Sequence, residues 1–408
     1  MSPDGQATSV LYVSYDGLLE PLGSSQVLPY LRALARRGYA MRVLSFEKAA
    51  DLERGPAVAA LRDELAAEGI GWEALRYHKR PSLPATAWDV AAGRRRVAAW
   101  ARRARLHGGR AGLVHARGYV AGLMGLAGRG AGARLLFDMR GFWVDERIAG
   151  GYWSPGGLPA RVGRWAERRL LDRSDHLVLL TRRGGDRVAE LASGGAPPPW
   201  SVVPTCVDVT RFRPPGDAAA VRRELGVGPA PVLLHIGTLT GWYDGRLTME
   251  VGRAWTESTG GSFVVLTRQT EEARRLAREA GVDALVRYVE PAEIPRWLQA
   301  GDAGLALPRV SPSKDASFPT KIAEYLACGL AVLATPIGDV PDYADDGSLR
   351  LFGGRDDVKD AVAWLASAAR DPERGARARA VAEARLGVES GADVLERVYR
   401  SLGVEPRR

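Results

Sequence analysis

The segment DASFPTKIAEYLACGLAVLAT, residues 315–335, decides the fold of this chain. Pro319 stands where a helix would begin and Gly329 where it would end. Between them, apolar side chains recur at three- and four-residue spacing, which gives the helix one apolar face. The apolar run 330–334 follows the glycine and is typical of a buried strand. The segment therefore predicts a helix that leads into a strand of an α/β sheet.

The first turns of this predicted helix carry Lys321 and Glu324 among free backbone N–H groups. A lysine at a helix start attracts phosphate oxygens, and a glutamate accepts hydrogen bonds from sugar hydroxyls. The alternative is that both residues only form the water-facing side of a surface helix. The chain has 57 Lys and Arg residues, of which five are lysine: Lys48, Lys79, Lys314, Lys321 and Lys359. Because lysine is so scarce, its position here favours a site for a phosphate and a polyol.

The bulk composition limits the class of protein. A length of 408 residues suits two domains, and 46% apolar with 26% charged residues is typical of a globular chain. Cys206 and Cys328 are far apart, and the five histidines have no metal-binding spacing, so we expect neither disulfides nor a metal site. The polar start and the interrupted apolar stretch 112–127 predict no signal peptide and no membrane span. We expect a cytoplasmic location.

The chain is basic, with a formal net charge of +9 and a pI near 9.7. We expect no nucleic-acid partner, because the arginines are spread over both halves without a basic tail or interleaved aromatic residues. A phosphate-bearing substrate or an anionic membrane surface fits better. The arginines of a predicted helix at 89–106 could rest on lipid headgroups, or they could form a solvated face over a core. Peripheral contact with the inner face of a membrane is therefore left open.

The first half begins with a strand at 10–14, a loop at 15–25, a helix at 26–37 and a strand at 42–46. This order predicts a parallel sheet with a right-handed crossover, in which ligands lie beyond the carboxyl ends of strands. Gly23 and Ser24 lie in the loop, which either cradles phosphate or sugar or is a tight turn without a ligand.

Further strands are predicted at 112–116, 134–138 and 176–180. The strand at 134–138 ends at Asp138 and leads into a loop that contains Arg140 and several carboxylates. Gly141 beside the arginine would let a ligand approach the backbone closely. We interpret Asp138 and Arg140 as part of an acceptor or phosphate loop, with structural ion pairing as the alternative.

A proline-rich segment at 194–215 predicts a linker, after which the alternation of strands and helices restarts. The second half has predicted strands at 232–236, 262–266, 285–289 and 303–307, with a glycine-rich loop at 237–246. The predicted fold class is therefore α/β with two doubly wound parallel sheets. We expect domains at 1–205 and 206–375, with C-terminal helices at 376–408. The loops at the strand ends should converge on a cleft between the two sheets.

Four ordered motifs resemble one known family. Residues 318–332 are similar to the donor-site helix of glycosyltransferase family 4, a group with the GT-B fold. Residues 167–181 resemble its segment "E…aD.vv..s", residues 204–214 its interdomain signature "PNGVDxxxFxP", and residues 337–342 its segment "vGgxpE". The resemblance extends from about residue 10 to residue 365.

The resemblance implies two Rossmann-like domains facing a central cleft, with a nucleotide-sugar donor on the C-terminal domain and an acceptor on the N-terminal one. It implies glycosyl transfer with retention, no cofactor other than the nucleoside-diphosphate sugar as co-substrate, no obligatory metal, and a last helix that crosses back to the first domain. The acceptor is not specified: a sugar, a lipid-linked glycan or a small molecule would fit. The expected donor-binding residues are Gly237, Thr238, Arg246, Arg268, Ser317, Phe318, Pro319, Thr320, Lys321 and Glu324. The expected catalytic residues are Arg140, Lys321 and Glu324, and the expected acceptor residues are Gly23, Ser24, Asp138 and Arg140.

This chain departs from the family pattern at several positions. The family's first motif glutamate falls on Ala316, and its usual Arg and Lys after the first C-domain strand fall on Thr238 and Asp244. The family's histidine in the N-terminal domain falls at about Arg140. The cations that remain to neutralise a diphosphate are Arg246, Arg268 and Lys321. Without an imidazole base, the departing phosphate itself can take the proton of the acceptor.

We therefore predict a retaining glycosyltransferase. An epimerase or hydrolase of nucleotide sugars on the same scaffold is one alternative, although such enzymes usually need more acid–base side chains than this chain offers. A non-catalytic protein that binds sugar or lipid is another, suggested by Ala316. Turnover without an acceptor would indicate the first alternative, and an absence of nucleotide release with any donor and acceptor would indicate the second.

Overall fold

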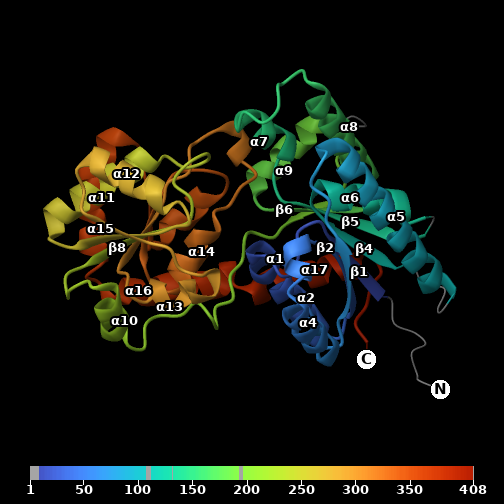
Figure 1. Cartoon of the computed structure of the whole chain (residues 1–408), viewed down its shortest axis with the longest axis horizontal. Helices are drawn as coiled ribbons and strands as arrows, with labels where there is room; N and C mark the ends of the chain where they lie inside the picture. The colour runs from blue at the N-terminus through green and yellow to red at the C-terminus, as the bar shows by residue number, and fades with distance from the viewer. Residues whose placement is uncertain (1–8, 107–111, 131, 193–195, 408) are drawn as a thin grey trace. The chain divides into compact units, whose positions relative to one another are not determined.

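The computed structural model describes residues 9–106, 112–130, 132–192 and 196–407 (Figure 1). The chain forms two compact units, each of which is described by itself. The first contains Met1–Pro204 and Gly391–Arg408, and the second contains Thr205–Ser390. Residues 194 and 195, at the start of the predicted linker, lie outside the described part of the chain.

The first unit is built on a seven-stranded, wholly parallel sheet with the order β3-β2-β1-β4-β5-β6-β7. The strands are β1 (Ser9–Ser14), β2 (Ala40–Glu47), β3 (Gly71–Arg76), β4 (Leu113–Arg117), β5 (Arg134–Met139), β6 (His176–Leu179) and β7 (Trp200–Val202). The β4 and β6 side chains are buried throughout, as expected for central strands covered by helices on both faces. The order fits a doubly wound sheet, as predicted.

Helices of the first unit fill the connections between these strands. They are α1 (Pro21–Gln26), α2 (Leu28–Arg36), α3 (Ala49–Leu52), α4 (Gly55–Ala67), α5 (Ser82–Leu106), α6 (Gly118–Gly128), α7 (Trp143–Ala149), α8 (Leu158–Arg173) and α9 (Arg182–Leu191). The core under α5 and α6 includes Val97, Trp100 and Met124. The final helix, α17 (Val388–Ser401), enters this unit at Gly391, and its Asp393 and Glu396 form ion pairs with Arg37 on the α2 side.

The second unit repeats the architecture with a six-stranded parallel sheet of order β10-β9-β8-β11-β12-β13. Its strands are β8 (Val232–Ile236), β9 (Ser262–Leu266), β10 (Ala284–Arg287), β11 (Ala303–Ala306), β12 (Ala331–Ala334) and β13 (Leu349–Leu351). Its α-helices are α10 (Ala218–Leu225), α11 (Gly245–Thr259), α12 (Thr270–Ala280), α13 (Ile294–Leu298), α14 (Thr320–Ala327), α15 (Val358–Ala368) and α16 (Pro372–Val381). Within the unit, this is the order 3-2-1-4-5-6 of a dinucleotide-binding fold.

Two local predictions were wrong. The segment 15–25 is not all loop, because α1 begins at Pro21 and contains Gly23. A Cβ on Gly23 would come within 1.9 Å of the Gly17 carbonyl oxygen, so the bare glycine allows close packing of two backbone segments. The proline-rich segment is not all linker either, because β7 lies within it and pairs with β6.

Candidate functional site

The strand orders identify where ligands should bind in each unit. In a doubly wound sheet, the crevice lies beyond the carboxyl ends of the two strands at which the order reverses. These strands are β1 and β4 in the first unit and β8 and β11 in the second. Many of the predicted site residues lie at or beside these places, and each group is described within its own unit.

Helix α14 follows β11 and begins at Thr320, with Pro319 at the N-cap, as the sequence predicted. Its Tyr325 side chain fixes the helix on the sheet. The Tyr325 hydroxyl accepts a hydrogen bond from the Ile236 N–H at 3.0 Å and lies 3.4 Å from the Leu305 carbonyl. Both partners belong to the two strands of the switch point. The first turn of α14, with its free N–H groups, is thereby held at the carboxyl ends of β8 and β11.

Lys321 lies in this first turn and is 7% exposed. Within the described residues, its ammonium nitrogen has no hydrogen-bond partner. A Cβ added at Gly237, which has a φ of 94°, would lie 3.7 Å from that nitrogen. The loop after β8 thus leaves open backbone beside a buried cation. A buried ammonium without a partner is costly unless an anion joins it.

Tyr243, from the glycine-rich loop after β8, covers the lysine. Its ring centroid lies 3.9 Å from the Lys321 nitrogen, within the range of a cation–π contact. The preceding residue, Trp242, lies in the same way over Lys314, at 4.0 Å. Two consecutive aromatic residues of one loop therefore contact the two lysines on either side of the α14 start.

Burial controls the protonation of this site. It lowers the pKa of Lys321 to about 7, although Glu324 partly opposes the shift. Burial likewise raises the pKa of Glu324 to about 7, against the opposing charges of Lys321 and Arg211. His235 is fully buried, and burial together with the nearby Lys321 holds its pKa well below the usual value. Both pKa values therefore lie near neutral pH, and the charge of each group influences the pKa of the other.

The other predicted donor residues surround this centre in different ways. Thr238, Arg246 and Arg268 are exposed and lie after β8, at the start of α11 and after β9. Phe318 is buried, and its carbonyl accepts a hydrogen bond from the Thr205 hydroxyl at 2.9 Å. Ser317 and Thr320 are partly buried beside it. The structure thus brings Gly237 together with Lys321, and it places the two arginines as exposed cations at strand and helix ends.

Two positions that depart from the family pattern have clear structural roles. Ala316 is 2% exposed, so a small apolar side chain fills the place of the first motif glutamate. Asp244 caps helix α11, where its side chain accepts a hydrogen bond from the Leu247 N–H at 3.0 Å. A carboxylate at this helix start is favourable.

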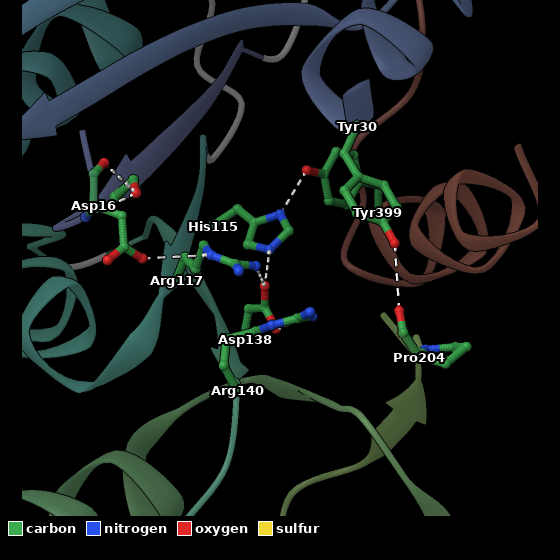
Figure 2. Close-up of polar contacts among 9 residues, drawn as sticks. Asp16, Tyr30, His115, Arg117, Asp138, Arg140, Pro204 and Tyr399 are labelled. Atoms are coloured by element: carbon green, nitrogen blue, oxygen red, sulfur yellow. Dashed lines mark hydrogen bonds and ion pairs between the residues drawn. The ribbon is translucent and has the colours of Figure 1, made fainter. Parts of the chain in front are cut away.

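In the first unit, a buried polar cluster lies at the ends of β1, β4 and β5 (Figure 2). The Asp138 carboxylate lies 3.5 Å from Arg117, 3.4 Å from Arg140 and 3.9 Å from the His115 ring. Asp16, just after β1, lies 3.7 Å from the Arg117 Nε. That Nε makes no hydrogen bond within the described residues, although the Arg117 side chain is only 4% exposed. The ion pair of Asp138 with Arg140, which was the alternative to an acceptor or phosphate loop, is present.

The protonation of this cluster is fixed by its charges. Burial alone would raise the pKa of Asp138, but Arg140, His115 and Arg117 together hold it below the usual value. Burial lowers the pKa of His115, against the pull of Asp138. The His115 Nδ1 lies 2.8 Å from the hydroxyl of Tyr399 on α17 (Figure 2). Asp138 is thus anionic, His115 is neutral, and the two arginines are the cations of the site.

Gly23 and Ser24 lie in α1, and among the described contacts neither residue makes a hydrogen bond with the Asp138 cluster. Ser24 is exposed, and its hydroxyl donates to the Pro21 carbonyl at 3.1 Å. The loop before α1 is shaped instead by Glu47, which accepts hydrogen bonds from the Leu18 and Leu19 N–H groups at 2.8 and 3.4 Å.

Sequence reasoning missed several residues of both clusters. Tyr243 stood in the glycine-rich loop that it had singled out, but the cation–π geometry has no sequence signature. His115 lies in the predicted strand 112–116 and Arg117 directly follows it, but neither residue was predicted to belong to a site. Two polar residues at the end of a buried strand could have indicated a buried polar site, since buried polar groups seldom lack a partner or a role.

Among the described residues, no helix combines the length and the apolar composition that a membrane-spanning segment requires. That part of the chain also gathers no group of three or more His, Cys, Asp or Glu side chains placed to hold a metal ion.

Two family models match the chain. A "Glycosyl transferase 4-like domain" matches residues 24–206, and "Glycosyl transferases group 1" matches residues 230–371. Similar curated proteins include D-inositol 3-phosphate glycosyltransferase 2 of Catenulispora acidiphila, 28% identical over 63% of this chain and 62% of that protein. The D-inositol 3-phosphate glycosyltransferase of Thermomonospora curvata is also 28% identical, over 70% of each chain. The chain thus spans about three fifths of the length of the first relative.

Solved structures share the fold. Anabaena Alr3699/HepE in complex with UDP and glucose has a TM-score of 0.66 at 16% identity, covering 97% of this chain and 99% of that one. Sucrose-phosphate synthase from Thermosynechococcus elongatus has a TM-score of 0.64 at 16% identity, with the same coverage. These similarities show the GT-B fold, with its two parallel-sheet α/β domains. Together with the two family models, they identify the chain as a member of glycosyltransferase family 4, in the group 1-like branch.

Proposed function

We propose that this protein transfers a sugar from a nucleoside-diphosphate sugar to an acceptor hydroxyl, with retention at the anomeric carbon and without a metal ion. The observation that carries the proposal is the buried Lys321 ammonium, which has no hydrogen-bond partner within the described residues and lies at the start of α14. A diphosphate placed there would receive both the lysine and the helix N–H groups. The cation would then have the anion that its burial requires.

In the proposed reaction, the bond from the anomeric carbon to the diphosphate oxygen breaks while the bond to the acceptor oxygen forms on the same face. The acceptor proton passes to the departing phosphate. Lys321 and the α14 start stabilise the negative charge that builds on the leaving oxygen. Arg246 and Arg268 are exposed cations that add to this stabilisation, and Glu324 accepts hydrogen bonds from sugar or ribose hydroxyls.

UDP is the first nucleotide to test. The Anabaena protein that shares the fold is described in complexes with UDP and with UDP-glucose. At 16–17% identity this likeness concerns the fold, so the nucleotide of the present chain stays a proposal. The α14 start, Gly237 and the residues from Ser317 to Thr320 would form the binding surface.

We propose further that the acceptor carries a phosphate group. Two of the similar curated proteins are named as D-inositol 3-phosphate glycosyltransferases. Arg117 and Arg140 converge on one carboxylate at the strand ends, and the Arg117 Nε makes no hydrogen bond within the described residues. Arginine binds phosphate through paired hydrogen bonds. Arg140 would then position the acceptor, and Asp138 would hold the Arg140 side chain in place. Gly23 and Ser24, on the helix that follows β1, are the other predicted acceptor residues.

The first experiment is a thermal-shift screen with UDP, GDP, ADP and dTDP sugars. A ligand at a hundredfold excess over its Kd stabilises by about 2.7 kcal/mol, so the donor should be evident. The second is a nucleotide-release assay with that donor and D-inositol 3-phosphate or unphosphorylated inositol. Release that needs the acceptor supports transfer. Equal release without any acceptor would indicate a hydrolase, and stabilisation without release would indicate a binding protein.

Variants test the assignment of Lys321. Lys321→Ala should lower kcat/KM at least tenfold, which corresponds to about 1.4 kcal/mol of transition-state stabilisation. Lys359→Ala is the matched control, because Lys359 is an exposed lysine on α15 of the same unit. Unchanged turnover in Lys321→Ala would remove this lysine from the mechanism.

A further inference from the structure

Helix α8 of the first unit carries an apolar seam on its outer face. Leu158, Val162 and Trp165 are 65%, 46% and 57% exposed. Their four- and three-residue spacing places them above one another on one side of the helix. Tyr152, in the connection before α8, is 70% exposed. Large apolar residues that are exposed in succession over so short a segment indicate a docking surface, whereas single exposed ones need no explanation.

Arginine residues flank this seam. Arg161, Arg168 and Arg169 are exposed, and none of them pairs with a carboxylate in the part of the chain that the structure describes. The Arg169 guanidinium lies 6.0 Å from the Trp165 ring centroid. Arg164, in contrast, is held by ion pairs with Asp145 and Glu167. The charges of Arg161, Arg168 and Arg169 are therefore not neutralised by a carboxylate of the described chain, and they can bind an external anion.

The arginines also line a depression. Pro155, Arg161, Arg164, Trp165 and Arg168 are among the residues around a hollow of about 370 Å³. Guanidinium groups bind phosphate oxygens through paired hydrogen bonds. Tryptophan favours the boundary between lipid headgroups and acyl chains, because its ring is apolar and its N–H is polar. Because the surface of the hollow is mainly apolar, the hollow and the seam fit acyl chains, and the guanidinium groups around them fit the lipid phosphates.

Helix α5, the sequence-based candidate for lipid contact, lacks this combination. Its arginines are exposed, but Val97, Trp100 and Ala101 between them are buried in the core. Among its described side chains, the large apolar ones that are exposed, Leu83 and Trp88, precede the arginine run. The α5 face therefore offers charge without an adjoining apolar seam, which makes it a suitable control.

We propose that the α8 face, defined as Leu158, Arg161, Val162, Trp165, Arg168 and Arg169, docks on a bilayer surface that contains anionic phospholipids. The formal net charge of +9 favours the same partner. An interfacial helix binds in this way, with its apolar side in the headgroup region and its basic residues on lipid phosphates. This inference concerns membrane attachment and does not depend on the proposed transfer reaction.

Vesicle flotation tests the proposal with the full chain. Vesicles of phosphatidylcholine mixed with phosphatidylglycerol should bind the protein, and pure phosphatidylcholine vesicles should bind it weakly. The triple variant Arg161→Ala, Arg168→Ala, Arg169→Ala should reduce the partition coefficient about a hundredfold, at about fivefold for each arginine. Trp165→Ser should reduce the partition coefficient about tenfold, because the variant lacks the apolar ring that would be buried in the lipid. The α5 triple variant Arg94→Ala, Arg95→Ala, Arg102→Ala removes the same charge, and its partition coefficient should stay within about threefold of the wild-type value.

Several results would overturn the proposal. Equal losses in the α8 and α5 triple variants would mean that binding follows net charge alone. Equal binding to both kinds of vesicle, or to neither, would exclude recognition of anionic lipid. Displacement by millimolar inorganic phosphate at constant ionic strength would identify a soluble phosphate site. Concentration-dependent dimers that Trp165→Ser abolishes would identify a second copy as the partner. A far-UV CD spectrum and a thermal midpoint equal to those of the wild type confirm that each variant is folded.

Discussion

The Lys321 ammonium lies 3.9 Å from the centre of the Tyr243 ring and makes no hydrogen bond within the described residues. The ring supplies the partial negative charge of its face, which is weaker than a full anion. The lysine is therefore held at the start of α14 in an incompletely compensated state. Such strain in the unliganded protein favours binding of an anion, because the anion restores the missing interactions.

Lys321→Met should stabilise the unliganded protein and impair its reaction. Methionine has a similar length and no charge to desolvate, so we expect the free energy of unfolding to rise by about 2 kcal/mol near pH 6. Burial lowers the lysine pKa from 10.5 to about 7. The buried charge therefore destabilises the folded protein fully below pH 7, and this destabilisation disappears as pH rises toward 10.5. The gain should therefore shrink at about pH 9. Urea unfolding at the two pH values measures it.

The control for this experiment is Lys359→Met, on the exposed side of α15. It should change the unfolding free energy by less than about 0.5 kcal/mol at either pH. A destabilised Lys321→Met variant, or a gain that is independent of pH, would contradict a buried cation with a lowered pKa.

Binding of UDP should take up protons near neutral pH. The unliganded lysine has a pKa of about 7, and a bound diphosphate would raise it. The affinity should consequently fall as pH increases above 7, by up to about tenfold per pH unit. Calorimetry in buffers of different ionisation enthalpy measures the number of protons taken up. Lys321→Met provides the control, because its remaining proton uptake reports the diphosphate and Glu324 without the lysine. Equal uptake by both proteins would show that Lys321 does not titrate on binding.

Most of the fold could be predicted from the sequence because its elements are bounded by strong local signals. The strands 232–236 and 262–266 agree with β8 and β9 at both ends. Helix α6 was not predicted because glycines interrupt its helical pattern. A Cβ on Gly122 would come within 2.9 Å of the Leu170 side chain, so a tertiary contact selects glycine there. The three-residue strands β7 and β13 are too short to show a pattern.

The candidate site was predictable only in part. Lys321 and Glu324 stand out because a helix start imposes a sequence pattern. The contact of the Tyr243 ring with Lys321 depends on the path of a loop. The contact of Tyr399 with His115 joins residues that are 284 positions apart in the sequence. Neither relationship leaves a periodic or spacing signal in a single sequence.

Asp138→Asn should destabilise the first unit. The change leaves Arg117 and Arg140 close together without the carboxylate between them, and loss of one partner of a buried ion pair costs about 3–5 kcal/mol. The Asp138 pKa lies below its ordinary value of 3.8, so its contribution is present above pH 3.8 and is lost as pH falls below it. The difference between the variant and the wild type should thus narrow in acid. Urea unfolding as a function of pH measures it.

Asp63→Asn is a suitable control, because Asp63 is an exposed carboxylate on α4 of the same unit. A stability loss in Asp138→Asn that stays constant down to pH 3 would contradict the lowered pKa of Asp138.

Tyr399→Phe should weaken the attachment of the C-terminal helix to the first unit. The hydroxyl is the hydrogen-bond partner of the buried His115 Nδ1 at 2.8 Å, and its removal leaves that nitrogen unsatisfied. We expect a loss of about 1–2 kcal/mol in unfolding free energy, since the ring and its packing against Tyr39 at 5.3 Å are kept. Ser401→Ala is the matched control, because among the described residues its hydroxyl donates only to the Val398 carbonyl of the same helix. Hydrogen exchange should show faster opening of residues 391–401 in Tyr399→Phe but not in Ser401→Ala. Equal exchange in the two variants would mean that packing alone holds the helix and that the contact with His115 contributes nothing.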